Sequence, residues 1–221
     1  MEITWLGHAS FRIRVRAGGE WVSIVTDPYE PAMVGLRFPR VTAEIVTVSH
    51  EHEDHNKVDL VLSDKSPKIL RGPGEYEVKG VVIRGIASWH DSSSGSNRGE
   101  NTIFVFELEG IRVVHLGDLG HKLTERQLDE IGNCDILLIP VGGLYTITPQ
   151  TAAEVVSQLE PKIVIPMHYK VSGMTNSFAD LSSVEEFIKI MGIQAKHQEK
   201  FEAKRETLGE ELQLVVLEIK K

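Results

Sequence analysis

The sequence predicts an α/β fold: one domain in which two β-sheets pack together and helices lie outside them. The first half contains short strands of alternating polar and apolar residues. The second half alternates continuous apolar strands with amphipathic helices. No linker, low-complexity segment or short repeat interrupts the 221 residues, a length within the range of one large domain. We therefore expect a single domain over residues 1–221.

The first half is expected to contain mainly strands and turns. The sequence "RAGGEW" favours a hairpin turn between the second and third strands, and residues 57–62 favour one or two helical turns. The segment "SWHDSSSGSNRGEN" is a polar loop, and loops of this length inside compact domains are often functional. The expected strands cover residues 3–5, 10–16, 20–26, 44–48, 69–71, 76–78, 81–87, 102–108 and 111–116.

The second half is expected to contain three helices between buried strands. Thr124 and Gly132 bracket "LTERQLDEIGN" as N-cap and C-cap. The stretch "TPQTAAEVVSQLEP" predicts a helix capped by Thr148 with Pro149 at its first position. The third helix, "SSVEEFIKIMG", ends at Gly192. The apolar runs "ILLIP" and "KIVIPMH" predict strands buried on both faces, and "ELQLVVLEI" predicts a final strand.

Composition narrows the class of protein. The chain is 41% hydrophobic and 25% charged, which is typical of a soluble globular protein. The single cysteine, Cys134, excludes an intramolecular disulfide, and its apolar neighbours favour a buried, inert thiol. No window approaches the ~18 apolar residues of a membrane span, and the N-terminus enters a strand pattern without a signal segment. We therefore expect a cytoplasmic protein with no membrane partner.

Residues 49–56, "SHEHEDHN", hold three histidines and three carboxylates directly after the apolar run "EIVTV". In an extended segment residues two apart point to the same side, so His50 and His52 can bind one ion. Asp54 and His55 follow a turn and can reach a second ion. Neutral imidazole and carboxylate suit zinc, manganese or iron. A solvated polar loop is the alternative, which the spacing after a buried strand disfavours.

Further ligand types follow other predicted strands. His90 lies in "ASWHD", Asp118 in "HLGDLGH" and His168 in "IVIPMHYK". Sites in α/β proteins tend to assemble at the carboxyl ends of strands. Each residue alone could be an ordinary strand-end residue, but their recurrence together with the histidine cluster favours one shared metal site.

These motifs, in this order, resemble the metal motifs of the metallo-β-lactamase fold superfamily. The N-terminal "TWLGHASFRI" and "TDP" resemble its cytoplasmic branch of Zn-dependent hydrolases, which is related to the L-ascorbate 6-phosphate lactonase group. The resemblance spans about residues 3 to 170. It implies a four-layer αββα sandwich whose two halves meet at a metal cleft.

The resemblance also implies a site with two divalent transition-metal ions, zinc first, with manganese, nickel or iron as alternatives. A hydroxide bridging the ions would cleave a small ester, lactone or phosphoester, and Asp54 would accept its proton. The implied ligands are His50, His52 and His90 for the first ion, Asp54, His55 and His168 for the second, and Asp118 for both.

Several other residues have expected supporting roles. Asp27 in "TDP" resembles a buried aspartate that would orient a ligand, although a plain turn residue is an equal alternative. The family pattern directs His8 into the cleft, for substrate contact or proton transfer, against an ordinary strand-end histidine. His115 is expected in the core and His197 in solvent. The sequence leaves open whether His121 reaches the rim of the cleft.

We expect a small anionic or ester substrate, for which Arg98, Asn101, Tyr145 and Lys170 are candidate contacts, with ordinary solvated loop positions as the alternative. A nuclease of the same fold, acting on RNA or DNA, is a second hypothesis. The net charge of −8 disfavours a nucleic-acid partner, and no RNA-binding arm is present. A non-catalytic or redox metal protein is a third hypothesis. It is disfavoured because no carboxylate replaces a histidine at positions 50, 52, 55, 90 and 168, and because no flavin module is appended. The sequence leaves open a homo-oligomer.

Overall fold

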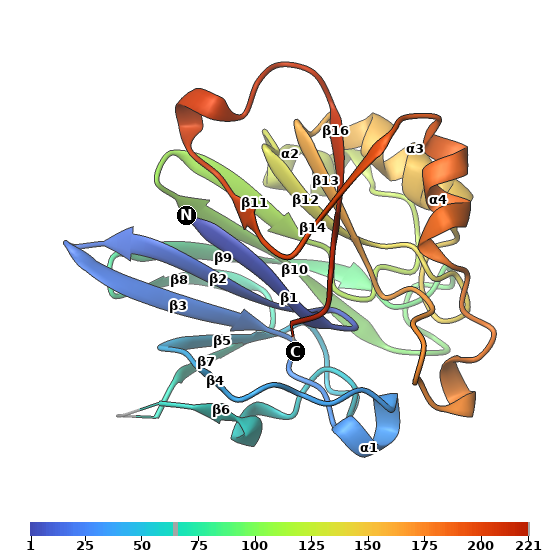
Figure 1. Ribbon diagram of the computed structural model, residues 1–221, viewed down its shortest axis with the longest axis horizontal. Coiled ribbons are helices and arrows are strands. Elements are labelled where there is room, and N and C mark those ends of the chain that lie inside the picture. The colour runs from blue at the N-terminus through green and yellow to red at the C-terminus, as the bar shows by residue number, and fades with distance from the viewer. Residues whose placement is uncertain (64–65, 221) are drawn as a thin grey trace.

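Five N-terminal strands and one short strand near the C-terminus form a six-stranded sheet in the computed structural model of the chain, which describes residues 1–63 and 66–220 (Figure 1). In spatial order its strands are β15 (Phe201–Glu202), β1 (Glu2–Gly7), β2 (Ser10–Ala17), β3 (Glu20–Thr26), β5 (Ile45–Val48) and β7 (Lys68–Arg71). Alternate residues of β2, Phe11, Ile13 and Val15, are buried in the core. This is the period of two expected for a strand with one face in the core.

An eight-stranded sheet packs against the first one. In spatial order its strands are β14 (Ala195–Gln198), β16 (Gln213–Leu217), β13 (Ile163–Met167), β12 (Ile136–Pro140), β11 (Ile111–His115), β10 (Glu100–Leu108), β9 (Val81–Trp89) and β8 (Gly74–Val78). Every residue of β12 and β13 is buried, as their continuous apolar sequences predict. The centre of this sheet is therefore covered on both faces.

One hydrophobic cluster joins the two sheets. Ile3 and Phe11 of the six-stranded sheet belong to the same buried cluster as Phe104 and Ile165 of the eight-stranded sheet. Cys134 lies in this cluster as well, and burial raises the pKa of its thiol, so the expectation of a buried, unreactive thiol is confirmed. Burial of this apolar area is the main force that docks the two sheets.

Helices and short strands form the outer layers (Figure 1). The helices α2 (Glu125–Ile131), α3 (Pro149–Leu159) and α4 (Val184–Met191) gather beside the eight-stranded sheet. On the other side, the pair β4 (Val41–Thr42) and β6 (Val61–Leu62) covers the six-stranded sheet, with the single turn α1 (Pro31–Val34) nearby. The predicted αββα sandwich is confirmed, with one thin outer layer. Among the described residues, no helix is long and apolar enough to cross a membrane.

Strand direction brings six strand ends to one region. β1 and β3 are both antiparallel to β2, and β5 is parallel to β3, so all three end at the same edge. In the second sheet β9 and β11 are both antiparallel to β10, and β12 and β13 continue in parallel with β11. The residues after β1, β3, β5, β9, β11 and β13 can therefore meet between the sheets.

Short elements differ from the sequence prediction. Residues 57–62 form the 3₁₀ turn η1 (Val58–Leu60) and then β6, because Val61 is buried in the outer apolar cluster and pairs with Val41. The expected helical turn is present as a 3₁₀ turn of three residues, and the rest of the segment is a strand. β14 contains His197, which is exposed as expected, although its polar sequence hides the strand. The remaining 3₁₀ turns are η2 (Asn176–Phe178) and η3 (Arg205–Thr207).

The cap of α2 is open to a direct test. Thr124 Oγ1 accepts a hydrogen bond from Gln127 N at 3.3 Å, and the Gln127 side chain accepts one from Thr124 N at 3.0 Å. Thr124→Ala removes this capping box, so we expect the free energy of unfolding in urea to fall by about 1 kcal/mol. Ser157→Ala removes an exposed hydroxyl inside α3 and should change it by less than about 0.5 kcal/mol. Equal losses of unfolding free energy in the two variants would contradict the capping role of Thr124.

Candidate metal centre

Eight imidazole and carboxylate side chains converge where the six strands end. His8 follows β1, and the "SHEHEDH" loop follows β5. His90 directly follows β9, Asp118 comes shortly after β11, and His168 directly follows β13. The structure thus brings together every residue that the sequence singles out as a ligand.

His50, His52 and His90 form the first ligand group. One ring nitrogen of each lies within 4.8 Å of the others. His50 and His90 are buried, whereas His52 is exposed, so this group borders solvent. Three histidines leave a coordination position for water or substrate in catalytic zinc sites.

His8, Asp54, His55 and His168 form the second ligand group, with ligand atoms again within 4.8 Å of one another. All four are buried. His8 is an addition to the three ligands that the resemblance implies. Its Nε2 donates a hydrogen bond to Asp54 Oδ2 at 3.1 Å, and its ring lies 3.9 Å from that of His168. His8 therefore reaches the cleft, and its role toward a substrate stays a prediction.

Asp118 lies between the two groups. Its Oδ2 approaches Nε2 of His55 at 3.2 Å, of His168 at 3.2 Å and of His90 at 3.3 Å. His90 belongs to the first group and the other two to the second. One carboxylate oxygen in contact with both groups has the placement of a shared ligand.

Several buried polar atoms of these residues have no hydrogen-bond partner among residues 1–63 and 66–220. Among them are Nε2 of His50, His55 and His168, and Oδ1 of Asp118. A buried polar group without a partner costs about 1–3 kcal/mol, and folded proteins seldom leave several together. Each of these atoms carries a lone pair that a cation would satisfy once the imidazole is neutral. The residues therefore fit a metal site.

Burial and nearby charges prepare these groups for metal binding. Burial, reinforced by the charge on His55, lowers the pKa of His50 well below its usual value. Burial likewise lowers the pKa of His90. For Asp118, burial alone would raise the pKa, but the neighbouring imidazoles of His168 and His55 lower it well below its usual value. His50 and His90 are thus neutral and Asp118 is ionised, as ligation requires.

Asp27, directly after β3, orients two ligands. Its Oδ2 accepts hydrogen bonds from His55 Nδ1 at 2.9 Å and from Ser49 Oγ at 2.6 Å. The Ser49 hydroxyl has one proton, which it donates to Asp27. It therefore acts as the acceptor toward His50, whose Nδ1 lies 3.0 Å from Ser49 Oγ and donates its proton. In their neutral forms both imidazoles therefore present an unprotonated Nε2 to the site. This is the orienting role predicted for Asp27. The sequence analysis did not predict that Ser49, the residue before His50, links Asp27 to His50.

Asn101, in β10, holds the loop that carries Asp118. Its Oδ1 accepts from Asp118 N at 2.9 Å, and its Nδ2 donates to Leu116 O at 2.9 Å and Ser88 Oγ at 2.7 Å. Gly117 is required beside it: φ is +55°, and a Cβ there would lie 2.4 Å from Asn101 Oδ1. Both N–H donors of the Asn101 amide are used inside the protein, so Asn101 positions Asp118.

Three residues of the site have a left-handed backbone. φ is +52° at His8, +38° at Asp27 and +52° at His168. Such values are uncommon for residues other than glycine and cluster at functional sites. Each of the three directly follows a strand, where the chain must turn sharply to direct the side chain between the sheets.

Two further histidines are structural. His115 is fully buried: its Nε2 donates to Ala9 O at 2.8 Å, and its Nδ1 accepts from Gly117 N at 3.2 Å. The prediction of a core residue is confirmed. His121 Nε2 accepts from Trp89 N at 3.1 Å, and its Nδ1 donates to a neighbouring carbonyl. Both nitrogens of His121 are used to support the loop after β9, so they are not directed at the ligand groups.

The family described as the Beta-lactamase superfamily domain matches residues 2–168. This chain belongs to that superfamily. It is 30% identical to the UPF0173 metal-dependent hydrolase of Thermococcus onnurineus, over 89% of this chain and 94% of that protein. It is 27% identical to the UPF0173 metal-dependent hydrolase MK1542 of Methanopyrus kandleri, over 76% of this chain and 84% of that protein.

Solved structures agree with this membership of the superfamily. A Thermotoga maritima protein assigned to the Zn-dependent hydrolases of the metallo-β-lactamase superfamily has a TM-score of 0.78 and 40% identity, covering 98% of this chain and 97% of that one. Igni18, a metallo hydrolase from Ignicoccus hospitalis, has a TM-score of 0.67 and 21% identity, covering 100% and 96%, and shows the shared fold alone. The chain is a metal-dependent hydrolase of the metallo-β-lactamase superfamily.

Asp27→Asn tests the orientation of the ligands. The change removes the charge that holds His55 and Ser49, and losses of this kind cost about 10- to 100-fold in metal affinity. We expect zinc affinity, measured against a chromophoric chelator, to fall by that factor. Asp135→Asn is the control, because Asp135 is a buried carboxylate that pairs with Arg205. It should lower thermal stability and leave zinc affinity unchanged. Unchanged affinity in Asp27→Asn would refute the orienting role.

Zinc affinity should rise with pH. Burial alone would lower the pKa of His55, but the carboxylates of Asp118 and Asp54 raise it well above its usual value, so the metal-free ring is protonated near neutral pH. Because a ligating imidazole must be neutral, metal binding has to displace this proton. Calorimetry of zinc binding at about pH 6 and about pH 8, in buffers of different ionisation enthalpy, measures the number of protons released. His55→Gln should release fewer protons than the unmodified protein. If the unmodified protein releases no protons on binding zinc, the prediction is contradicted.

Proposed function

We propose that this hydrolase holds two divalent transition-metal ions, zinc first, and cleaves a small ester, lactone or phosphoester. The observation that carries the proposal is the contact of Asp118 Oδ2 with imidazoles of both ligand groups. The proposed ligands are His50, His52 and His90 for the first ion, Asp54, His55 and His168 for the second, and Asp118 for both. The buried nitrogens without partners support this assignment.

The two cations would supply a water molecule whose pKa is lowered toward about 7 and would stabilise negative charge on the attacked oxygen. Asp54 is the proposed proton acceptor. Burial alone would raise its pKa, but His55 and the hydrogen bond from His8 lower it, so the carboxylate is ionised. The hydrogen bond from His8 Nε2 to Oδ2 fixes the orientation of this carboxylate.

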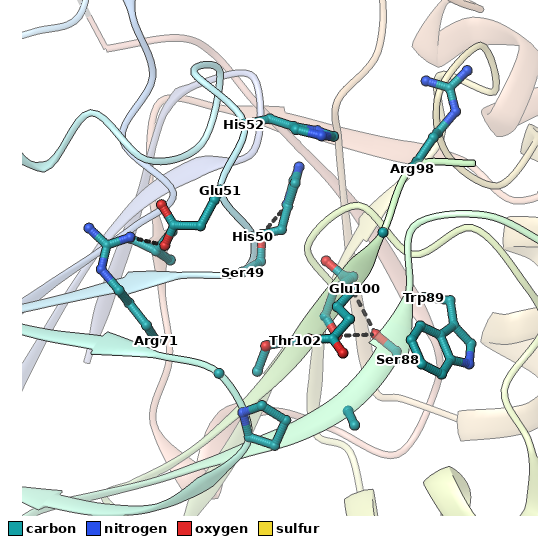
Figure 2. Close-up of a pocket in the computed structure, with 16 residues that line it drawn as sticks. Ser49, His50, Glu51, His52, Arg71, Ser88, Trp89, Arg98, Glu100 and Thr102 are labelled. Atoms are coloured by element: carbon teal, nitrogen blue, oxygen red, sulfur yellow. Dashed lines mark hydrogen bonds and ion pairs between the residues drawn. The ribbon is translucent and has the colours of Figure 1, made fainter. Parts of the chain in front are cut away.

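A cavity of about 480 Å³ opens beside the first ligand group (Figure 2). His50 and His52 line one wall, and Ser88 and Trp89 line another. This volume suits a small molecule, and specificity in such sites comes from a few polar groups in the walls. Because the ring of His52 is exposed, the first ligand group lies at the entrance, and a substrate would enter from this side.

We further propose that the substrate is a small molecule and that the protein acts in the cytoplasm. The net charge of −8 opposes binding to a nucleic-acid backbone. The one cysteine is buried and forms no disulfide, which suits a reducing compartment.

Metal analysis together with a substrate panel tests the proposal. Purified, zinc-reconstituted protein should hold about two equivalents of metal and hydrolyse at least one class among lactones, thioesters and phosphodiesters. Asp118→Ala and His52→Ala should each lose bound metal and lower kcat/KM by at least about a hundredfold, because a ligand contributes more than its supporting residues do. Treatment with a chelator should abolish turnover, and added zinc should restore it.

His197→Ala is the matched control, because His197 is an exposed histidine in the edge strand β14. Metal content and turnover should both be unchanged by it. If Asp118→Ala still binds about two equivalents of metal, the assignment of Asp118 as a shared ligand is refuted. Failure of every substrate class with two metals bound would sink the proposed reaction.

A further inference from the structure

The cavity beside the first ligand group contains two arginines in different electrostatic situations. Arg71 and Arg98 lie on opposite sides of the view in Figure 2. The Arg71 guanidinium is paired with Glu51, which lines the same cavity. The Arg98 guanidinium has no hydrogen-bond or ion-pair partner within the described ranges 1–63 and 66–220, and its side chain is exposed. One positive charge is thus neutralised, and the other remains available to a ligand.

Arg98 is held by an aromatic ring. Its guanidinium carbon lies 4.7 Å from the ring centroid of Tyr145. The hydroxyl of Tyr145 donates to Ser177 O at 2.8 Å, and its ring packs against Phe178, with the centroids 5.8 Å apart. Stacking occupies one face of the guanidinium and leaves its in-plane N–H groups free. These are the groups that bind a carboxylate or phosphate through two parallel hydrogen bonds.

The loop that carries Arg98 is organised by Asp91. The Asp91 carboxylate accepts hydrogen bonds at 2.7 to 3.0 Å from four backbone N–H groups, those of Ser93, Gly95, Asn97 and Arg98. Burial alone would raise its pKa, but these donors lower the pKa to about 2. At the base of the loop, the ligand His90 donates its backbone N–H to Gly99 O at 3.1 Å. A pre-ordered loop reduces the entropy lost when a ligand binds, and this one links Arg98 to the metal centre.

The other candidate contacts are already used within the protein. The amide of Asn101 holds the Asp118 loop, and the hydroxyl of Tyr145 is bonded to a backbone carbonyl. Lys170 Nζ donates to Ala179 O. Lys170 keeps two of its three N–H donors but does not line the cavity, so Arg98 is the one of these four residues that both lines the cavity and retains free side-chain donors.

We propose that Arg98 binds an anionic oxygen group of the substrate, a carboxylate or a phosphate, set a few atoms away from the bond that is cleaved. The proposal rests on the hydrolase function proposed above. It narrows the substrate to small anionic esters or lactones. Tyr145 and Asp91 are positioning residues for the Arg98 guanidinium.

Binding to the zinc-loaded protein tests this with two pairs of probes. Monomethyl glutarate carries a carboxylate, and dimethyl glutarate is its neutral counterpart; glycerol 3-phosphate and glycerol form the second pair. We expect Arg98→Gln to raise the dissociation constant of the anionic probes by about tenfold or more, by calorimetry, because a charge-assisted pair of hydrogen bonds is lost. The neutral probes should be unaffected. Whichever anionic probe loses more affinity identifies the preferred group.

Two more variants sharpen the result. Arg98→Lys keeps the charge but loses the planar fork, so its affinity should fall between those of the other two proteins. Arg16→Gln is the matched control: Arg16 also stacks on an aromatic ring, 5.3 Å from the Trp21 centroid, but lies in a hairpin strand away from the cavity. It should leave all dissociation constants unchanged. Equal losses in Arg16→Gln and Arg98→Gln would overturn the proposal, as would anionic probes that bind equally well without Arg98.

Hydrolysis of the two glutarate esters separates the two proposals. If Arg98→Gln weakens anion binding but the unmodified protein cleaves no ester, lactone or phosphoester, the anion site stands and the proposed reaction fails. If both esters are cleaved and Arg98→Gln leaves the ratio of their kcat/KM values unchanged, the reaction stands and the anion site is refuted.

Discussion

The burial of Asp118 among imidazoles is the constraint on which the rest of the structure depends. A carboxylate inside a protein is tolerated only when it is paired, because its desolvation is costly. Asp118 meets this condition through the Nε2 atoms of His55, His90 and His168, which follow strands of both sheets. Oδ1 of the same carboxylate has no partner in the described chain, which a bound cation would change. The charge balance of the centre therefore requires that both sheets be docked.

The strained backbone of the site lies where the two sheets pack together. The left-handed residues His8 and His168 are joined directly, since His168 N donates to His8 O at 3.1 Å. That bond connects the end of β1 to the end of β13, across the two sheets. Conformations of this kind cost on the order of 1–3 kcal/mol each and persist only where the surroundings over-determine them. The apolar core that docks the sheets supplies this support, so it stabilises the geometry of the site as well as the fold.

The sequence was sufficient to single out the side chains that converge, because their signal is local: an apolar run followed closely by histidine or aspartate, as at His50, His90 and His168. It was insufficient for contacts between the sheets. The bond between His8 and Asp54 joins residues 46 apart in the chain, and only the packing of the sandwich creates it. The roles of polar residues were ambiguous for another reason. The sequence does not distinguish a buried asparagine such as Asn101 from a solvated one, and only the hydrogen bonds in the structure do so. The polar edge strand β14 was missed because it lacks apolar alternation.

The two ligand groups differ in their access to solvent, and this difference assigns them different tasks in the proposed mechanism. His55 and His168 are fully buried, whereas His52 is exposed and borders the cavity. A substrate that enters through the cavity meets the first group and then Asp118. The proton of the attacking water would be received on the buried side, by Asp54, whose carboxylate is held by the hydrogen bond from His8. Separating substrate entry from proton transfer in this way would leave the cavity walls free to vary with the substrate, because none of the residues proposed for the second ion is among those that line the cavity.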